Sequence, residues 1–257
     1  MKIILLLGTI LILITPVYAV DFSEHATNGT LDEQWVHLGM DSAGNYNDDP
    51  VVVADGNAPD GDGYVIEFYD RDKNYFGIAG LSATPETWLD LTLQGYVYAY
   101  ATPQEGSNVQ AGYIFRASPE VETHYGRVLL NFPDTGGEIK LQTYTGAWKT
   151  EIINIDDSLA TEGWHQLIID VSGEDHDQVG IFLDGIYIGT KTMSDLAPGG
   201  ELEAAGTIGL SILHYNPTNV VPVYFDAIEV NPDMGPTATP EPTATPSSGI
   251  KSWDIYL

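Results

Sequence analysis

The chain has no cysteine among its 257 residues. Disulfides therefore cannot stabilise it, so a hydrophobic core, with or without a bound metal ion, must hold the fold together. Basic residues are also scarce: 9 Lys and Arg stand against 37 Asp and Glu, a formal net charge of −28 at pH 7. A field of this sign repels phosphate backbones and anionic lipids, so we expect no nucleic-acid partner.

The N-terminus carries the main uninterrupted apolar run, which extends from Ile3 to about Ile14 after a single cation, Lys2. Pro16 and a small-residue end at Ala19 follow it, in the order typical of a cleaved secretory signal peptide. The run is shorter than the roughly 20 residues that span a bilayer. We predict a secreted, extracellular or cell-surface protein with no membrane insertion after cleavage; an uncleaved anchor is the alternative.

The C-terminal composition changes abruptly at Pro236, where "PTATP" occurs at 236–240 and again at 242–246. A Pro/Thr segment of this kind is an extended linker without a core, and after a signal peptide it favours a bacterial source. The final "IKSWDIYL" is too short to fold alone. The predicted organisation is a signal peptide, one domain, a linker and a tail at residues 1–19, 20–234, 235–249 and 250–257.

Short β-branched and aromatic segments alternate with turn sequences such as "PDGDG" at 59–63. In "WHQLIIDV" (164–171), Leu167, Ile169 and Val171 share one face, and Asp184-Gly185 suits a tight hairpin turn. This pattern predicts an all-β fold of two antiparallel sheets packed as a sandwich. The expected strands lie at 63–69, 91–100, 110–117, 125–132, 138–144, 164–171, 179–190, 207–213 and 222–230.

Three segments resemble, in their order, the laminin-G-like branch of the concanavalin A-like jelly rolls. They are "GWHQLIIDVSGEDHDQVGIFLDGIYIGTKT" (163–192), "AGTIGLSIL" (205–213) and "VYFDAIEV" (223–230). The earlier "AGYIFRAS" (111–118) is similar to the G-x-x-F-R strand of keto-disaccharide hydrolase-type domains. The resemblance covers roughly residues 60–230 and implies a two-sheet antiparallel jelly-roll sandwich. It does not carry a function by itself.

The resemblance also implies a structural calcium ion. In many of these jelly rolls the Asp of the last-strand "FD" motif helps to hold calcium, and Asp226 matches it here. Alternation puts Asp226 on the face of Tyr224 and Ile228, where a carboxylate without a partner is costly. Ca²⁺ would satisfy it, with backbone carbonyls as further ligands. The alternative is a carboxylate that accepts backbone N–H bonds or pairs with a cation.

Tyr96, Tyr98 and Tyr100 occupy alternate positions of "LTLQGYVYAY" (91–100), so their rings form one stripe opposite the aliphatic residues. Aromatic faces stack on sugar rings, and phenol hydroxyls add hydrogen bonds. We therefore predict that the stripe binds a poly- or oligosaccharide. The alternative is that these tyrosines only cover the sheet with cross-strand aromatic pairs.

Two arginines, Arg116 and Arg127, lie in predicted strands, and Arg116 stands at the family-matched "FR" position. We predict that both contact the ligand, since arginine makes oriented polar contacts. The alternative is pairing with the many carboxylates. Trp164 begins a strongly patterned strand and is expected in the core.

The acid pair of jelly-roll glucanases, E-x-D-x-x-E or E-x-D-x-E, is absent from the sequence. Glu151 and Asp156 would lie on opposite faces of an extended strand. We assign no catalytic residue, and the first hypothesis is a secreted, non-catalytic carbohydrate-binding module stabilised by calcium. The alternatives are a glycan-active hydrolase or lyase related to the keto-disaccharide hydrolases, and an adhesion or structural module that binds protein. The oligomeric state stays open.

Overall fold

The computed structural model describes residues 22–31, 35–37, 49–68, 76–81, 88–100, 109–118, 124–132, 136–172, 177–197, 202, 205–214 and 221–230. The predicted signal peptide, linker and tail lie outside these residues. Across the described ranges, no helix is long and apolar enough to cross a membrane.

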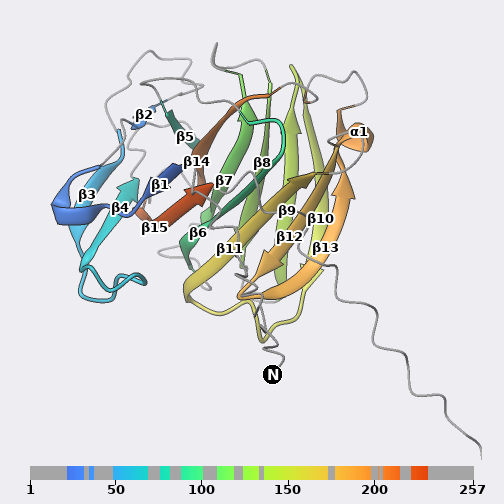
Figure 1. Cartoon of the computed structure of the whole chain (residues 1–257). Helices are drawn as coiled ribbons and strands as arrows, with labels where there is room; N and C mark the ends of the chain where they lie inside the picture. Colours follow the sequence, from blue (N-terminus) through green and yellow to red (C-terminus); the bar gives the residue numbers. More distant parts are fainter. Residues whose placement is uncertain are drawn as a thin grey trace, which may run out of the picture.

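The described residues form two antiparallel sheets, which Figure 1 shows as two facing layers. Sheet A has the order β13-β12-β11-β6-β15-β4-β3, with β1 paired to β15. Its strands are β1 (Phe22–Glu24), β3 (Val51–Ala54), β4 (Tyr64–Phe68), β6 (Leu91–Ala99), β11 (Gly163–Ser172), β12 (Gln178–Leu183), β13 (Ile186–Thr192) and β15 (Val223–Val230).

Sheet B has the order β10-β9-β8-β7-β14-β5-β2. Its strands are β2 (Trp35–His37), β5 (Phe76–Leu81), β7 (Val109–Ala117), β8 (Tyr125–Asn131), β9 (Gly137–Tyr144), β10 (Trp148–Ile155) and β14 (Thr207–His214). The described helices are short: a 3₁₀ turn, η1 (Thr27–Gly29), and α1 (Met193–Leu196). The predicted all-β, two-sheet jelly-roll sandwich is therefore confirmed.

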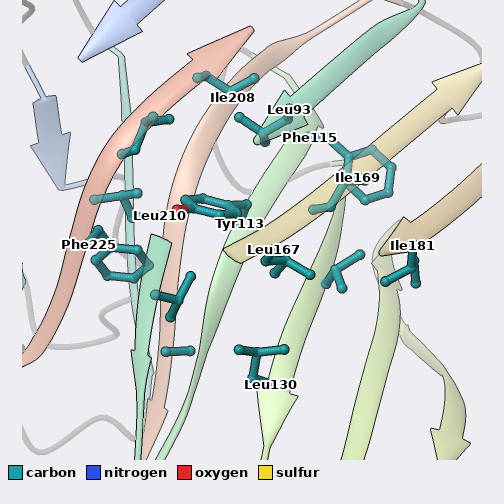
Figure 2. Packing of buried hydrophobic residues seen from close by; sticks show 14 of the residues in the cluster. Leu93, Tyr113, Phe115, Leu130, Leu167, Ile169, Ile181, Ile208, Leu210 and Phe225 are labelled. Atoms are coloured by element: carbon teal, nitrogen blue, oxygen red, sulfur yellow. The ribbon is translucent and has the colours of Figure 1, made fainter. Parts of the chain in front are cut away.

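The core lies between the two sheets and follows the alternation in the sequence. Leu167 and Ile169 of β11 and Leu141 of β9 are fully buried, whereas Gln166 and Lys140, their neighbours along the chain, are only half-buried. Figure 2 shows residues of sheet A meeting those of sheet B across this interior. Each large apolar side chain buried there contributes about 1.5–3 kcal/mol.

The predicted hairpin at Asp184-Gly185 is present between β12 and β13. Both residues have positive φ, 51° and 76°, as the tight turn requires. The Asp184 carboxylate also contacts β11: it accepts a hydrogen bond from the Gln166 N–H at 2.9 Å and lies 2.7 Å from Nδ1 of the buried His165. The turn is therefore anchored to the neighbouring strand.

Candidate functional site

The tyrosine stripe lies on the outer face of sheet A, the face that points away from sheet B. Tyr96 and Tyr98 are half-buried there, while Val97 between them is fully buried in the core. Tyr100, just after β6, donates a hydrogen bond from its hydroxyl to the Pro222 carbonyl at 2.8 Å, and burial raises its pKa. The predicted orientation of the stripe is thus confirmed, and its role in ligand binding stays a prediction.

Tyr98 is the middle ring of a row that runs across three adjacent strands. Trp164 of β11 lies opposite Tyr98 in the register, with ring centroids 5.6 Å apart and planes at 90°. Tyr224 of β15 lies on its other side at 6.3 Å, again at 90°. We call Trp164, Tyr98 and Tyr224 the aromatic row. The prediction that Trp164 lies in the core was wrong. Along β11 the inward positions are Leu167 and, before it, His165, so Trp164 lies on the outer face and is half-buried.

Carboxylates flank the aromatic row. Glu67 of β4 lies opposite Tyr224 in the register, and Glu162 stands two residues before Trp164. Burial is the main cause that raises the pKa of both phenols, and these carboxylates raise them further because they disfavour a phenolate. Asp55 adds to the negative potential at both rings. The outer face of sheet A therefore combines aromatic surface with negative charge.

Arg116 is part of the structural framework of sheet B, whereas the stripe of Tyr96, Tyr98 and Tyr100 belongs to sheet A. Its side chain is 2% exposed, and its Nη1 donates to the Leu202 carbonyl at 2.7 Å. Nε donates to the Leu89 carbonyl at 2.8 Å, and Nη2 donates to the same oxygen. Its φ of 50° places the residue in the left-handed region at the end of β7. The guanidinium thus connects two loop segments to the sheet.

Arg127 lies on the outer face of sheet B, at the centre of a polar network. Its Nε donates to Gln142 Oε1 at 2.8 Å, and Nη1 donates to Ser211 Oγ at 3.0 Å. Gln142 in turn donates to Thr150 Oγ1 at 2.9 Å, so the network extends from β14 across β8 and β9 to β10. The guanidinium carbon also lies 4.1 Å from the Trp148 ring centroid, a cation–π contact.

Three aromatic rings adjoin this network and form what we call the Trp148 cluster: Tyr125 of β8, Tyr144 of β9 and Trp148 of β10. The Tyr144 and Trp148 centroids are 5.1 Å apart, and Tyr125 lies 5.7 Å from Tyr144 and 5.6 Å from Trp148. Tyr125 is buried, whereas Tyr144 and Trp148 are half-buried. Burial raises the Tyr125 pKa, and nearby Arg127 opposes that rise.

A second polar ladder crosses the other end of the same face. Gln110 Nε2 donates to Asn131 Oδ1 at 2.9 Å, and Asn131 Nδ2 donates to Glu138 Oε2 at 2.7 Å. Lys140 Nζ lies 3.9 Å from the same Glu138 oxygen. Among the described residues of β7, β8, β9, β10 and β14, Glu138 is the one carboxylate on this outer face.

The five predicted ligand-binding residues therefore do not form one site. Tyr96, Tyr98 and Tyr100 belong to sheet A, whereas Arg116 and Arg127 belong to sheet B. Sequence reasoning missed the Trp148 cluster and Glu138. The alternation of "EIKLQTY" does put Glu138, Gln142 and Tyr144 on one face, but only the strand register brings Arg127 and Trp148 to it.

Asp226 is fully buried, as the calcium prediction assumed, but its oxygens have backbone partners. Oδ2 accepts from the Asp60 N–H at 3.2 Å and Oδ1 from the Ala227 N–H at 2.8 Å. Burial, the largest cause, raises its pKa to about 6. Among the described residues no group of three or more His, Asp or Glu could hold a metal ion. Calcium at Asp226 stays a prediction.

The expected shared face of Asp226 and Ile228 was wrong. A bulge at Ala227, with φ of 48°, shifts the register between Asp226 and Glu229. Asp226 therefore stays opposite Tyr96 on the outer face, while Ile228 turns into the core. An extra residue in one strand reverses the alternation that follows it.

No protein-family model matches the chain, and no curated protein matches its sequence. Solved structures do share its architecture. The laminarinase catalytic domain of Thermotoga maritima is 14% identical, with 84% of this chain and 99% of that chain covered and a TM-score of 0.51. A lichenase, a β-1,3-1,4-glucanase derived from a mouse hindgut metagenome, is 13% identical, with 82% and 98% covered and a TM-score of 0.50.

The Crh5 transglycosylase is similar to the same degree: 15% identity, 84% of this chain and 85% of that chain covered, and a TM-score of 0.50. These structures contradict the first hypothesis, a non-catalytic carbohydrate-binding module, and favour its glycan-active alternative. The chain shares the concanavalin A-like jelly-roll fold with these glycan-active enzymes.

Proposed function

We propose that the protein is a secreted enzyme that acts on a polysaccharide, as a hydrolase or transglycosylase, with its substrate on the outer face of sheet B. The observation that carries this proposal is the combination found on that face. The Trp148 cluster, the Arg127 network and the Glu138 ladder occupy neighbouring strands of one sheet. The fold shared with glycan-active enzymes supports it.

The Trp148 cluster offers the stacking surface for a sugar ring. Trp148 and Tyr144 retain exposed surface, and Arg127 against the indole helps to fix its orientation. Gln142, Thr150 and Arg127 supply amide, hydroxyl and guanidinium groups beside the rings, which suit the hydroxyls of a sugar. This part of the face would bind and orient the chain.

The acid chemistry is assigned to Glu138. Glycosidic bonds are generally cleaved by a pair of carboxyl groups: one protonates the leaving oxygen, and the other activates water or attacks the sugar. We assign the first role, proton donation, to Glu138; the described outward positions of β7, β8, β9, β10 and β14 hold no second carboxylate. The outward positions of β8, an interior strand of the sheet, hold Tyr125, Arg127, Leu129 and Asn131, so no acid comes from that strand. Glu138 lies on the adjacent β9, where Asn131 and Lys140 contact the same oxygen and orient the carboxylate.

The test is product formation from a panel of β-1,3-glucan, β-1,3-1,4-glucan, agarose and xylan, followed by chromatography of released and transferred oligosaccharides. The wild-type chain is expected to yield products from at least one polymer. Glu138→Gln should lower kcat by about 100-fold or more, the range of general acid–base catalysis. Trp148→Ala should mainly raise KM.

Glu151→Gln is the matched control, because Glu151 is a carboxylate of the neighbouring β10 that contacts Lys191 of β13 instead. Its activity should equal that of the wild type. An inert wild-type protein across the panel would overturn the proposal. Equal rates for wild type and Glu138→Gln would overturn the role given to Glu138.

A further inference from the structure

The aromatic row lies on the opposite side of the molecule from the proposed substrate face. Tyr98 and Trp164 point outward from sheet A, while Arg127 and Glu138 point outward from sheet B, and the core lies between the two sheets. The three rings of the row retain exposed surface. A ligand on the row would therefore not compete with a substrate on sheet B.

The row extends across the sheet rather than along one strand. Trp164, Tyr98 and Tyr224 come from the neighbouring strands β11, β6 and β15, so the rings span about two strand spacings, roughly 10 Å. Tyr100 adds a fourth ring 5.1 Å from Tyr98. Because the Tyr98 ring stands at 90° to the rings of Trp164 and Tyr224, the row is not one flat platform; it is an extended aromatic surface whose rings alternate in orientation.

The charge on the row distinguishes it from the sheet B face. Glu67 of β4 is the register partner of Tyr224, and the exposed Glu162 stands two residues before Trp164. Both carboxylates, together with Asp55, act electrostatically on the phenols of the row. A neutral sugar that stacked here would remove water from these carboxylates without supplying a countercharge. A protonated amine would supply it, and aromatic faces also attract cations.

We infer that the aromatic row is a second binding surface, for a glycan whose sugar units carry protonated amino groups. Sugar units would contact the ring faces of Trp164 and Tyr224 on either side of the perpendicular Tyr98 ring, and the ammonium groups would lie against Glu67 and Glu162. This surface would hold an amino-sugar polymer while the opposite sheet remains accessible. The inference does not depend on catalysis at Glu138.

The experiment measures the affinity of the full chain for a β-1,4-linked glucosamine hexamer and for its N-acetylated counterpart, by isothermal titration calorimetry at pH 6. The free-amine hexamer is expected to bind at least 10-fold more tightly, with an affinity that falls as salt increases. The Glu67→Gln/Glu162→Gln double variant, which keeps the shape of both side chains, should lose most of this preference.

Tyr98→Ala should weaken the binding of the free-amine hexamer at least 10-fold. Tyr187→Ala is the matched control, because Tyr187 lies on β13 of the same sheet and packs against Phe182. It should bind as the wild type does. Circular dichroism and a thermal melt of every variant would show that it is folded, and product formation should be unchanged in Tyr98→Ala.

Equal affinity for the two hexamers would overturn the inference, because the amine would then contribute nothing. Equal binding to a lysine hexapeptide would also overturn it, since the row would then recognise cationic peptides. Loss of catalysis in Glu138→Gln with unchanged hexamer binding would support two separate sites. Loss of hexamer binding in that variant would place the amino sugar on sheet B and refute the inference.

Discussion

Arg116→Met tests whether Arg116 acts as a structural connection rather than as the ligand contact predicted from the sequence. Methionine has an apolar side chain of similar length, and the substitution removes the three donor nitrogens of the guanidinium. The carbonyls of Leu89 and Leu202 then lose their partners. Leu202 is buried, whereas Leu89 is half-buried, so water can replace the donor at Leu89 more easily.

The expected loss follows from these contacts. Hydrogen bonds to a charged group contribute about 1.5–3 kcal/mol, and an unsatisfied buried carbonyl costs about 1–3 kcal/mol. With one carbonyl rehydrated, the free energy of unfolding should fall by about 2–4 kcal/mol. For a domain of this length that corresponds to a Tm roughly 5–15 °C lower.

The assay is a urea or thermal unfolding curve, with Lys149→Met as the control. Lys149 is an exposed cation on β10, so its substitution should change stability by less than about 0.5 kcal/mol. Arg116→Lys should fall between wild type and Arg116→Met, because one ammonium cannot serve both carbonyls. If Arg116→Met unfolds at the same urea concentration as the wild type, the structural role is refuted.

Three further predictions concern stability. Gly95→Ala would place a Cβ against the Tyr113 hydroxyl, which donates to the Tyr96 carbonyl, so we expect a loss of about 1–3 kcal/mol in urea unfolding; an unchanged midpoint would contradict the packing. Burial raises the pKa of Asp170, so the folded state keeps its proton to higher pH and stability should fall as pH rises above about 4. In Asp170→Asn this part of the decline should be absent. If the free energy of unfolding of variant and wild type changed with pH in the same way, this prediction would be refuted. If Asp226 holds Ca²⁺, a chelator should lower the Tm of the wild type but not of Asp226→Asn; an unchanged wild-type Tm would refute calcium binding.

The strands with clear alternation could be predicted from the sequence. Segments such as 164–171 and 138–144 match β11 and β9 closely, because apolar residues occupy most inward positions of each, with His165 and Thr143 as the exceptions. The strands β1, β2, β3 and β5 were not predicted. The first two have only three residues, which is too short for a periodic pattern. The strand β10 was also missed as an element, because it lies at the edge of sheet B and none of its residues is fully buried.

The candidate sites could be predicted only in part, because strand pairing is a non-local property. Alternation correctly placed Tyr96 and Tyr98 on an outer face, but it could not reveal that Arg127 belongs to the other sheet. The alternation within β11 does place Trp164 on the same face as Gln166, opposite Leu167 and Ile169, so its outward position could have been predicted. The bulge at Ala227 has no comparable signal, and it changes the face of every residue after it.

The location of the substrate tests the central proposal most directly. A crystal structure of Glu138→Gln with an oligosaccharide taken from the polymer that the wild type cleaves would show it. We predict a sugar ring stacked on Trp148 and Tyr144, with a glycosidic oxygen within hydrogen-bond distance of position 138. An oligosaccharide bound elsewhere, with the outer face of sheet B vacant, would contradict the proposed active face.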